Sequence, residues 1–119
     1  MKKNRIFVIM LLSMLVFSLK IYTHPPTKIG LNFDNKEKIL RVEVEHPVLF
    51  VRQHYIKKIE VYLNDDLIIV QDFNYQLAKK TQKAGYFIFE AENGDVIKVK
   101  ANCNKHGDKT ARLVVQEKE

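Results

Sequence analysis

The chain contains four histidines and one cysteine, and all of them fall in short segments that resemble parts of a metal site. Imidazole and thiolate are ligands that iron, copper and zinc prefer, whereas magnesium and calcium prefer oxygen. Five such groups are one more than a closed tetrahedral zinc site needs, and they suffice for a square pyramid with one open position. An open position would allow chemistry at the metal. The candidate ligands are His24, His46, His54, Cys103 and His106.

Residues 1–18 have the pattern of an export signal. Lys2, Lys3 and Arg5 form a positively charged start, and a short apolar run follows over residues 6–16. This run is shorter than the roughly 20 apolar residues of a comfortable membrane span. We therefore predict a signal peptide over residues 1–18 and one domain over residues 19–119. An uncleaved anchor and a cut after Thr23 are the alternatives, and in each case the protein is exported, either periplasmic or membrane-anchored and facing outside the cytoplasm.

Export makes the single cysteine informative, because exported proteins usually hold their cysteines in disulfides. Cys103 has no second cysteine in the sequence with which to pair. It is therefore an intermolecular bridge, a buried inert thiol or a metal thiolate. A metal bond would also protect the sulfur from oxidation, which makes the third interpretation attractive.

The chain is basic, with 20 Lys and Arg against 14 Asp and Glu and a formal net charge of +6. The charges are interleaved along the sequence and form no blocks, as is typical of a solvated surface. This distribution argues against nucleic acid as a partner. A length of 119 residues indicates one domain.

From Lys28 onward, short stretches rich in alternating or β-branched apolar residues are separated by turn signals. Residues 74–83 are polar and irregular, with room for one helical turn, and Asn93-Gly94 predicts a hairpin turn. Seven strands without a long helix indicate an all-β protein, an immunoglobulin-like antiparallel β-sandwich. The candidate ligands then fall in or beside loops held by a rigid scaffold. The predicted strands cover residues 28–33, 39–44, 56–63, 67–70, 86–91, 96–101 and 110–116.

Four segments, taken in order, resemble the motifs of superoxide reductases, the neelaredoxin and desulfoferrodoxin family of non-haem iron proteins. A lone histidine–proline pair is a weak signal, the Cys-Asn-x-His-Gly element is fairly specific, and the ordered set is strong. The likeness covers His24 to Val115, nearly the whole predicted domain. The segments are His24-Pro25, His46-Pro47-Val48, His54-Tyr55-Ile56 and Cys103-Asn104-Lys105-His106-Gly107.

The resemblance implies one iron per chain, with the four histidines around it and the Cys103 sulfur bound beneath. Such a centre would reduce superoxide to hydrogen peroxide by one electron, with Cys103 as the catalytic axial thiolate. A small redox protein would serve as electron donor, and a homo-oligomer is compatible with this function. Backbone N–H groups of residues 104–106 would hydrogen-bond the sulfur, and Gly107 would permit the tight turn.

The sequence also departs from the family pattern. Members commonly carry a Glu-Lys pair before the first histidine, where the lysine draws in superoxide and the glutamate caps the oxidised iron. Tyr22 and Thr23 occupy those places here, and the gap from His46 to His54 is two residues longer than usual. An even insertion keeps side-chain parity in an extended segment. The alternative function is therefore an exported module that binds iron, copper or zinc, or a partner, without turnover.

Overall fold

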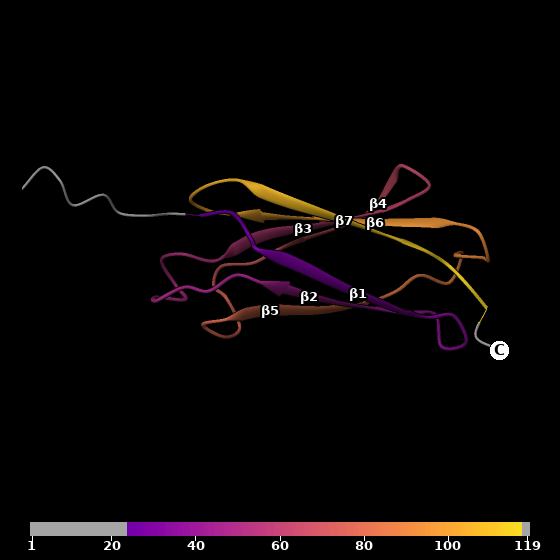
Figure 1. The fold of residues 1–119 in the computed structure, drawn as a ribbon, viewed down its shortest axis with the longest axis horizontal. Coiled ribbons are helices and arrows are strands. Elements are labelled where there is room, and N and C mark those ends of the chain that lie inside the picture. The colour runs from indigo at the N-terminus through magenta and orange to yellow at the C-terminus, as the bar shows by residue number, and fades with distance from the viewer. Residues whose placement is uncertain (1–23, 118–119) are drawn as a thin grey trace, which may run out of the picture.

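The computed structural model describes residues 24–117, so the predicted signal peptide, Tyr22 and Thr23 lie outside the described residues (Figure 1). The assignment of residues 1–18 to a signal stays a prediction. The described chain consists of β-strands, turns and loops, and residues 24–117 contain no helix that is long and apolar enough to cross a membrane. The strands are β1 (Lys28–Asp34), β2 (Ile39–Glu45), β3 (Ile56–Leu63), β4 (Asp66–Asp72), β5 (Thr81–Phe87), β6 (Val96–Cys103) and β7 (Asp108–Val114).

The strands form two sheets, one with the order β1-β2-β5 and the other with the order β4-β3-β6-β7. All neighbouring strands are antiparallel. The alternation in β2 shows why they form, because Leu40, Val42 and Val44 are buried between the sheets while Arg41 and Glu43 are exposed. The apolar faces of both sheets meet in one core. The prediction of an all-β sandwich of seven antiparallel strands is confirmed.

β5 lies well away from its predicted position, whereas the other strands match their predicted bounds to within two residues. β5 begins at Thr81, inside the segment that the sequence indicated to be irregular, and ends at Phe87, well before Ala91. Its residues show no apolar alternation, since a buried position is filled by Gln82 and another residue is Gly85. Pairing with β2 supplies the strand geometry that local pattern does not signal.

The turn at Asn93-Gly94 exists, and Gly94 has a φ of 89°. It is not a hairpin turn, however, because β5 and β6 belong to different sheets. The chain leaves β5 and crosses to the other sheet before this turn. A short hairpin with left-handed residues lies instead between β3 and β4, where Asn64 and Asp65 have φ values of 49° and 69°.

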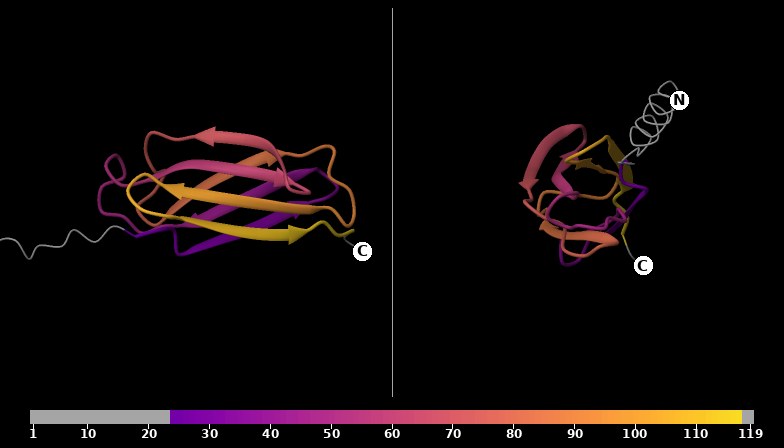
Figure 2. Two further views of the ribbon diagram at one scale, coloured as in Figure 1. Left: turned by 90° about the horizontal axis from the view of Figure 1, so that it is seen from above. Right: turned by 90° about the vertical axis from the view of Figure 1, so that its left-hand side faces the viewer.

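All candidate ligands lie at one end of the sandwich, which we call the site end. The register places the start of β1, the end of β2 and the start of β5 side by side, because Lys28 and Thr81 both pair with Glu45. In the second sheet, Ile56 at the start of β3 pairs with Cys103 at the end of β6. The described chain also begins here, at the left of Figure 1 and facing the viewer in the right panel of Figure 2.

Candidate metal centre

His46 and His54 both lie in the β2–β3 loop, which backbone hydrogen bonds hold in place. The backbone N–H of His46 donates to the carbonyl of Lys80 (2.9 Å), and that of Val48 donates to Lys79 (2.7 Å). These bonds join the β2–β3 loop to the segment before β5. Further along the loop, the N–H of His54 donates to the carbonyl of Phe50 (2.9 Å), which closes a turn that leads His54 into β3.

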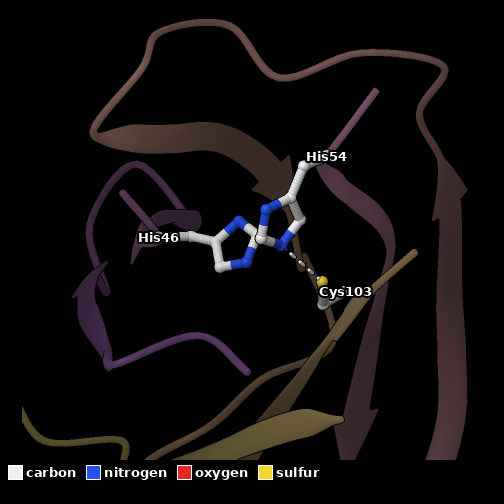
Figure 3. Close-up of side chains that lie close together, drawn as sticks. All are labelled: His46, His54 and Cys103. Atoms are coloured by element: carbon white, nitrogen blue, oxygen red, sulfur yellow. Dashed lines mark hydrogen bonds between the residues drawn. The ribbon is translucent and has the colours of Figure 1, made fainter. Parts of the chain in front are cut away.

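Three side chains at the site end point toward one another: His46, His54 and Cys103 (Figure 3). Each offers one ligand atom, and these atoms all lie within 4.8 Å of one another. The two rings are perpendicular, with their centroids 4.7 Å apart. His54 Nε2 lies 3.1 Å from Cys103 Sγ. The pairing of β3 with β6 explains this approach, because it sets the start of one strand beside the end of the other.

The ring of His24 joins this cluster from the segment before β1. Its centroid lies 5.1 Å from that of His46 and 5.3 Å from that of His54. Both ring nitrogens face backbone carbonyl oxygens, with Nε2 at 2.9 Å from Pro47 O and Nδ1 at 3.0 Å from Pro25 O. Binding a metal through His24 would therefore require its ring to turn out of at least one of these contacts.

His106 is placed differently from the other predicted ligands. Its side chain is exposed, and it is not part of the three-residue ligand group. The loop that carries it is closed by a bond from the Cys103 N–H to Gly107 O (3.0 Å), and the Lys105 N–H points at Cys103 Sγ (3.4 Å). The structure thus brings together His24, His46, His54 and Cys103, and His106 as a ligand stays a prediction.

Gly107 fixes this loop against the segment that carries His24. Its φ is 74°, a conformation that residues with a Cβ rarely adopt. A Cβ at this position would lie 2.8 Å from the Cβ of Pro25, which is too close for ordinary packing. A glycine is therefore needed both for the turn and for the approach of the N-terminal segment to the site.

Gln76 belongs to the site but carries no sequence signal that singled it out. It is fully buried, and its Nε2 donates to the carbonyls of His46 (2.7 Å) and Ala78 (2.9 Å). This orientation turns Oε1 toward His46 Nδ1 (2.8 Å) and the N–H of Ile56 (3.3 Å). An amide oxygen only accepts hydrogen bonds, so Nδ1 of His46 carries a proton and, in the neutral ring, Nε2 holds the lone pair.

Nε2 of His46 lies 3.2 Å from the carbonyl oxygen of His24. Both ring nitrogens can donate together only when the ring is doubly protonated, and a metal on Nε2 would replace the second proton. A ligand histidine that gives its other N–H to an acceptor is the usual arrangement at metal sites, because the acceptor fixes the tautomer and the ring orientation. The Gln76–His46 pair has this arrangement.

Asn104 locks the cysteine loop to the His54 loop. Its backbone N–H donates to Tyr55 O (3.0 Å), and its side-chain oxygen accepts the N–H of Tyr55 (2.9 Å). Its side-chain amide also donates to Gln53 O (3.0 Å). The asparagine of the Cys-Asn-x-His-Gly element therefore holds the residues on either side of His54 in place. The sequence predicts a role only for the backbone N–H of Asn104.

The electrostatics of the cluster favour neutral imidazole at His54. Burial lowers the pKa of His54 below its ordinary value, and positive charge on His46 and His24 lowers it further. Neutral imidazole is the form that binds a metal. Cys103 is buried beside it and is free of any disulfide. This set of nitrogen and sulfur donors fits iron, copper or zinc.

Comparison with known proteins places this arrangement in a family. The family model for desulfoferrodoxin matches residues 19–109. The chain belongs to the desulfoferrodoxin family. This is an iron-binding family, which agrees with the donor set of the cluster.

One similar solved structure is that of a variant of the superoxide reductase (neelaredoxin) from Ignicoccus hospitalis. It is 22% identical to this chain, the match covers 82% of each chain, and the TM-score is 0.51. At this identity the likeness supports the shared fold. No protein with a curated description matches the chain.

Proposed function

We propose that this desulfoferrodoxin-family chain is a superoxide reductase with one iron per chain. The observation that carries the proposal is the convergence of His46, His54 and Cys103, whose ligand atoms lie within 4.8 Å of one another. His24, whose ring contacts both histidine rings, and His106, on the loop after Cys103, are proposed to complete the ligand set. Superoxide is the proposed substrate, and a small redox protein the proposed electron donor.

Iron, once bound there, would supply the electron: superoxide gains one electron and two protons and leaves as hydrogen peroxide, while ferrous iron becomes ferric. The protein's own contribution is to hold the donors. Gln76 keeps the Nδ1 proton of His46 in place and so presents Nε2 as the ligand atom. The Lys105 N–H at Cys103 Sγ would moderate the electron donation of the sulfur. Burial of Cys103 protects the thiolate from solvent.

The alternative function is a metal-binding module on the same fold that performs no turnover. Tyr22 and Thr23 favour this alternative, because they replace the glutamate and lysine to which the resemblance assigns roles in handling superoxide. In both functions the site and the fold are the same. The two differ only in whether the bound metal reacts with superoxide. Export to the periplasm or to a membrane surface is proposed for both, from the pattern of residues 1–18.

The test is to load the full chain with iron, measure metal content, and follow its visible spectrum during pulses of superoxide. We expect one iron per chain, a blue band from thiolate-to-ferric charge transfer, and formation of that band when the ferrous protein meets superoxide. A protein that binds iron but keeps its ferrous spectrum in superoxide would support the module. Failure to bind iron, with tight binding of zinc or copper, would refute an iron enzyme.

A further inference from the structure

Two loops at the site end expose apolar side chains next to positive charges. Leu49 and Phe50 in the β2–β3 loop are 77% and 64% exposed, and Tyr75 and Leu77 in the β4–β5 loop are exposed as well. Residues 46–55 and 73–80 contain no aspartate or glutamate. We call this surface the loop patch; it comprises Leu49, Phe50, Arg52, Tyr75, Leu77, Lys79 and Lys80, all exposed.

The loop patch is one preformed surface, because the two loops are bonded together. The N–H of Gln76 donates to Val51 O (2.9 Å), on one side of the patch. On the other side, the N–H of Val48 donates to Lys79 O (2.7 Å). The guanidinium of Arg52 lies over the ring of Tyr75, 5.0 Å from its centroid. Apolar side chains held outward on such a framework indicate a surface that binds something.

The beginning of the described chain lies at the same end of the molecule. The ring of His24 contacts Pro47 O at 2.9 Å, directly beside the β2–β3 loop. Only residues 17–23 separate His24 from the apolar run at residues 6–16. Seven residues span at most about 25 Å even when fully extended. Where the run stays uncleaved as an anchor, which is the alternative to a cleaved signal peptide, it would therefore keep the site end, and not the opposite end, close to the membrane.

We propose that the loop patch docks on the surface of a bilayer that contains anionic lipids. Leu49, Phe50 and Leu77 would enter the boundary between headgroups and acyl chains, while Arg52, Lys79 and Lys80 would meet lipid phosphates. A patch that combines apolar side chains with basic ones binds a bilayer both by buried apolar area and by attraction to anionic lipids. Docking would turn the metal centre toward the membrane.

The opposite end of the sandwich provides a contrast. Phe87 and Phe89 are 60% and 70% exposed and stack with their ring centroids 5.3 Å apart. They lie where β5 ends, away from the site end, and Glu90 and Glu92 follow them in the sequence. Negative charges beside these rings would be repelled by anionic lipids. Exposed phenylalanine occurs at both ends. At the opposite end Lys36 and Lys38 stand among Glu37, Glu90 and Glu92, whereas the two loops of the loop patch carry positive charge without any acidic residue.

The chain contains no tryptophan, so a single introduced one reports its own surroundings. We would compare Phe50→Trp with Phe89→Trp in the full iron-loaded chain, mixed with vesicles of phosphatidylcholine and phosphatidylglycerol that contain brominated acyl chains. Both positions are exposed, so both variants should fold and keep the iron of the parent protein. We expect strong quenching and a blue-shifted emission for Phe50→Trp, and little of either for Phe89→Trp. Adding Lys79→Glu and Lys80→Glu to Phe50→Trp should reduce the quenching several-fold.

Equal quenching at the two positions would overturn the proposal, because the apolar run would then hold the domain without orienting it. Absence of quenching for Phe50→Trp would also overturn it, and would indicate that the loop patch faces water or a redox protein. Neither result depends on turnover of superoxide. The iron content and visible spectrum of the same samples test the proposed function separately.

Discussion

Replacement of Gln76 by leucine would test whether this buried amide prepares His46 to bind a metal. Leucine nearly preserves the volume but removes four hydrogen bonds, two accepted by Oε1 and two donated by Nε2. Each buried polar group left without a partner costs roughly 1–3 kcal/mol. Ala78 is exposed, so water can replace Gln76 at its carbonyl, and the His46 ring can change tautomer. The carbonyl of His46 and the N–H of Ile56 then stay unpaired, and we expect the free energy of unfolding to fall by about 2–6 kcal/mol. A domain near the middle of the ordinary range of stability, about 5–15 kcal/mol, would survive this loss.

The more specific consequence concerns the metal. Without the acceptor at Nδ1, the His46 ring is free to change tautomer and to rotate, and loss of such a partner typically lowers metal affinity about 10–100-fold. Affinity would be measured by competition with a chelator of known strength. The ¹⁵N shifts of the His46 ring in the metal-free protein would report the tautomer. In the parent protein we expect the proton on Nδ1, and in Gln76→Leu we expect this preference to be lost.

Gln82→Leu is the matched control. Gln82 is also a buried glutamine, and it accepts the N–H of Leu77 (2.9 Å) and donates to Lys83 O (2.9 Å), but no hydrogen bond joins it to a histidine. It should lose stability without a change in metal affinity or in the His46 tautomer. If the two leucine variants weaken metal binding equally, Gln76 is a structural residue and the reasoning fails.

Three further predictions concern residues around the site. Gly107→Ala should cost more stability than Gly94→Ala and should alone weaken metal binding, as denaturant unfolding and metal competition would show. Both glycines have positive φ, but a Cβ would lie 2.8 Å from the Cβ of Pro25 only at position 107 and would meet nothing within 4 Å at position 94. Cys103→Ser should abolish the visible band and lower the rate of superoxide reduction by orders of magnitude in pulse radiolysis. Because a bound metal stabilises the folded protein, a chelator should lower the melting temperature of the parent protein but hardly that of this variant. Thr23→Lys should raise the rate constant for reaction with superoxide, and the gain should shrink as ionic strength rises, because it adds a positive charge before the first histidine; a gain independent of salt would contradict this explanation.

The strands that the sequence predicted well are those in which one face is apolar and the other charged. β3 was predicted with its observed bounds, since Ile59 and Val61 alternate with charged or polar neighbours. β5 has a different origin. Its buried position is held by Gln82, whose side chain bonds the backbone of Leu77 and Lys83, so burial there depends on hydrogen bonds and not on apolar character. Local pattern carries no signal of such a strand.

The residues of the site also fall into those that the sequence indicates and those that only the structure reveals. Residue type singled out His46, His54 and Cys103, because imidazole and thiolate are uncommon and chemically distinct. Gln76 has an ordinary side chain whose role depends on contacts with His46, 30 residues away, and with the start of β3. Only the meeting of the two loops creates that role. A buried glutamine beside a ligand histidine is visible in three dimensions and has no counterpart in sequence spacing.

The long connection between His46 and His54 shows how the fold accommodates a departure from the family pattern. We expected an even insertion to preserve side-chain parity in an extended segment, yet the chain before His54 forms a turn, in which both Gln53 and His54 donate to the carbonyl of Phe50. Parity is irrelevant in a turn. What returns His54 to within 3.1 Å of Cys103 is the pairing of β3 with β6 together with the Asn104 bonds to Tyr55. Because these contacts fix the end of the loop, its middle is free to project outward, and it is there that Leu49 and Phe50 are exposed. The same loop therefore supplies a ligand at its end and the proposed membrane contact at its tip.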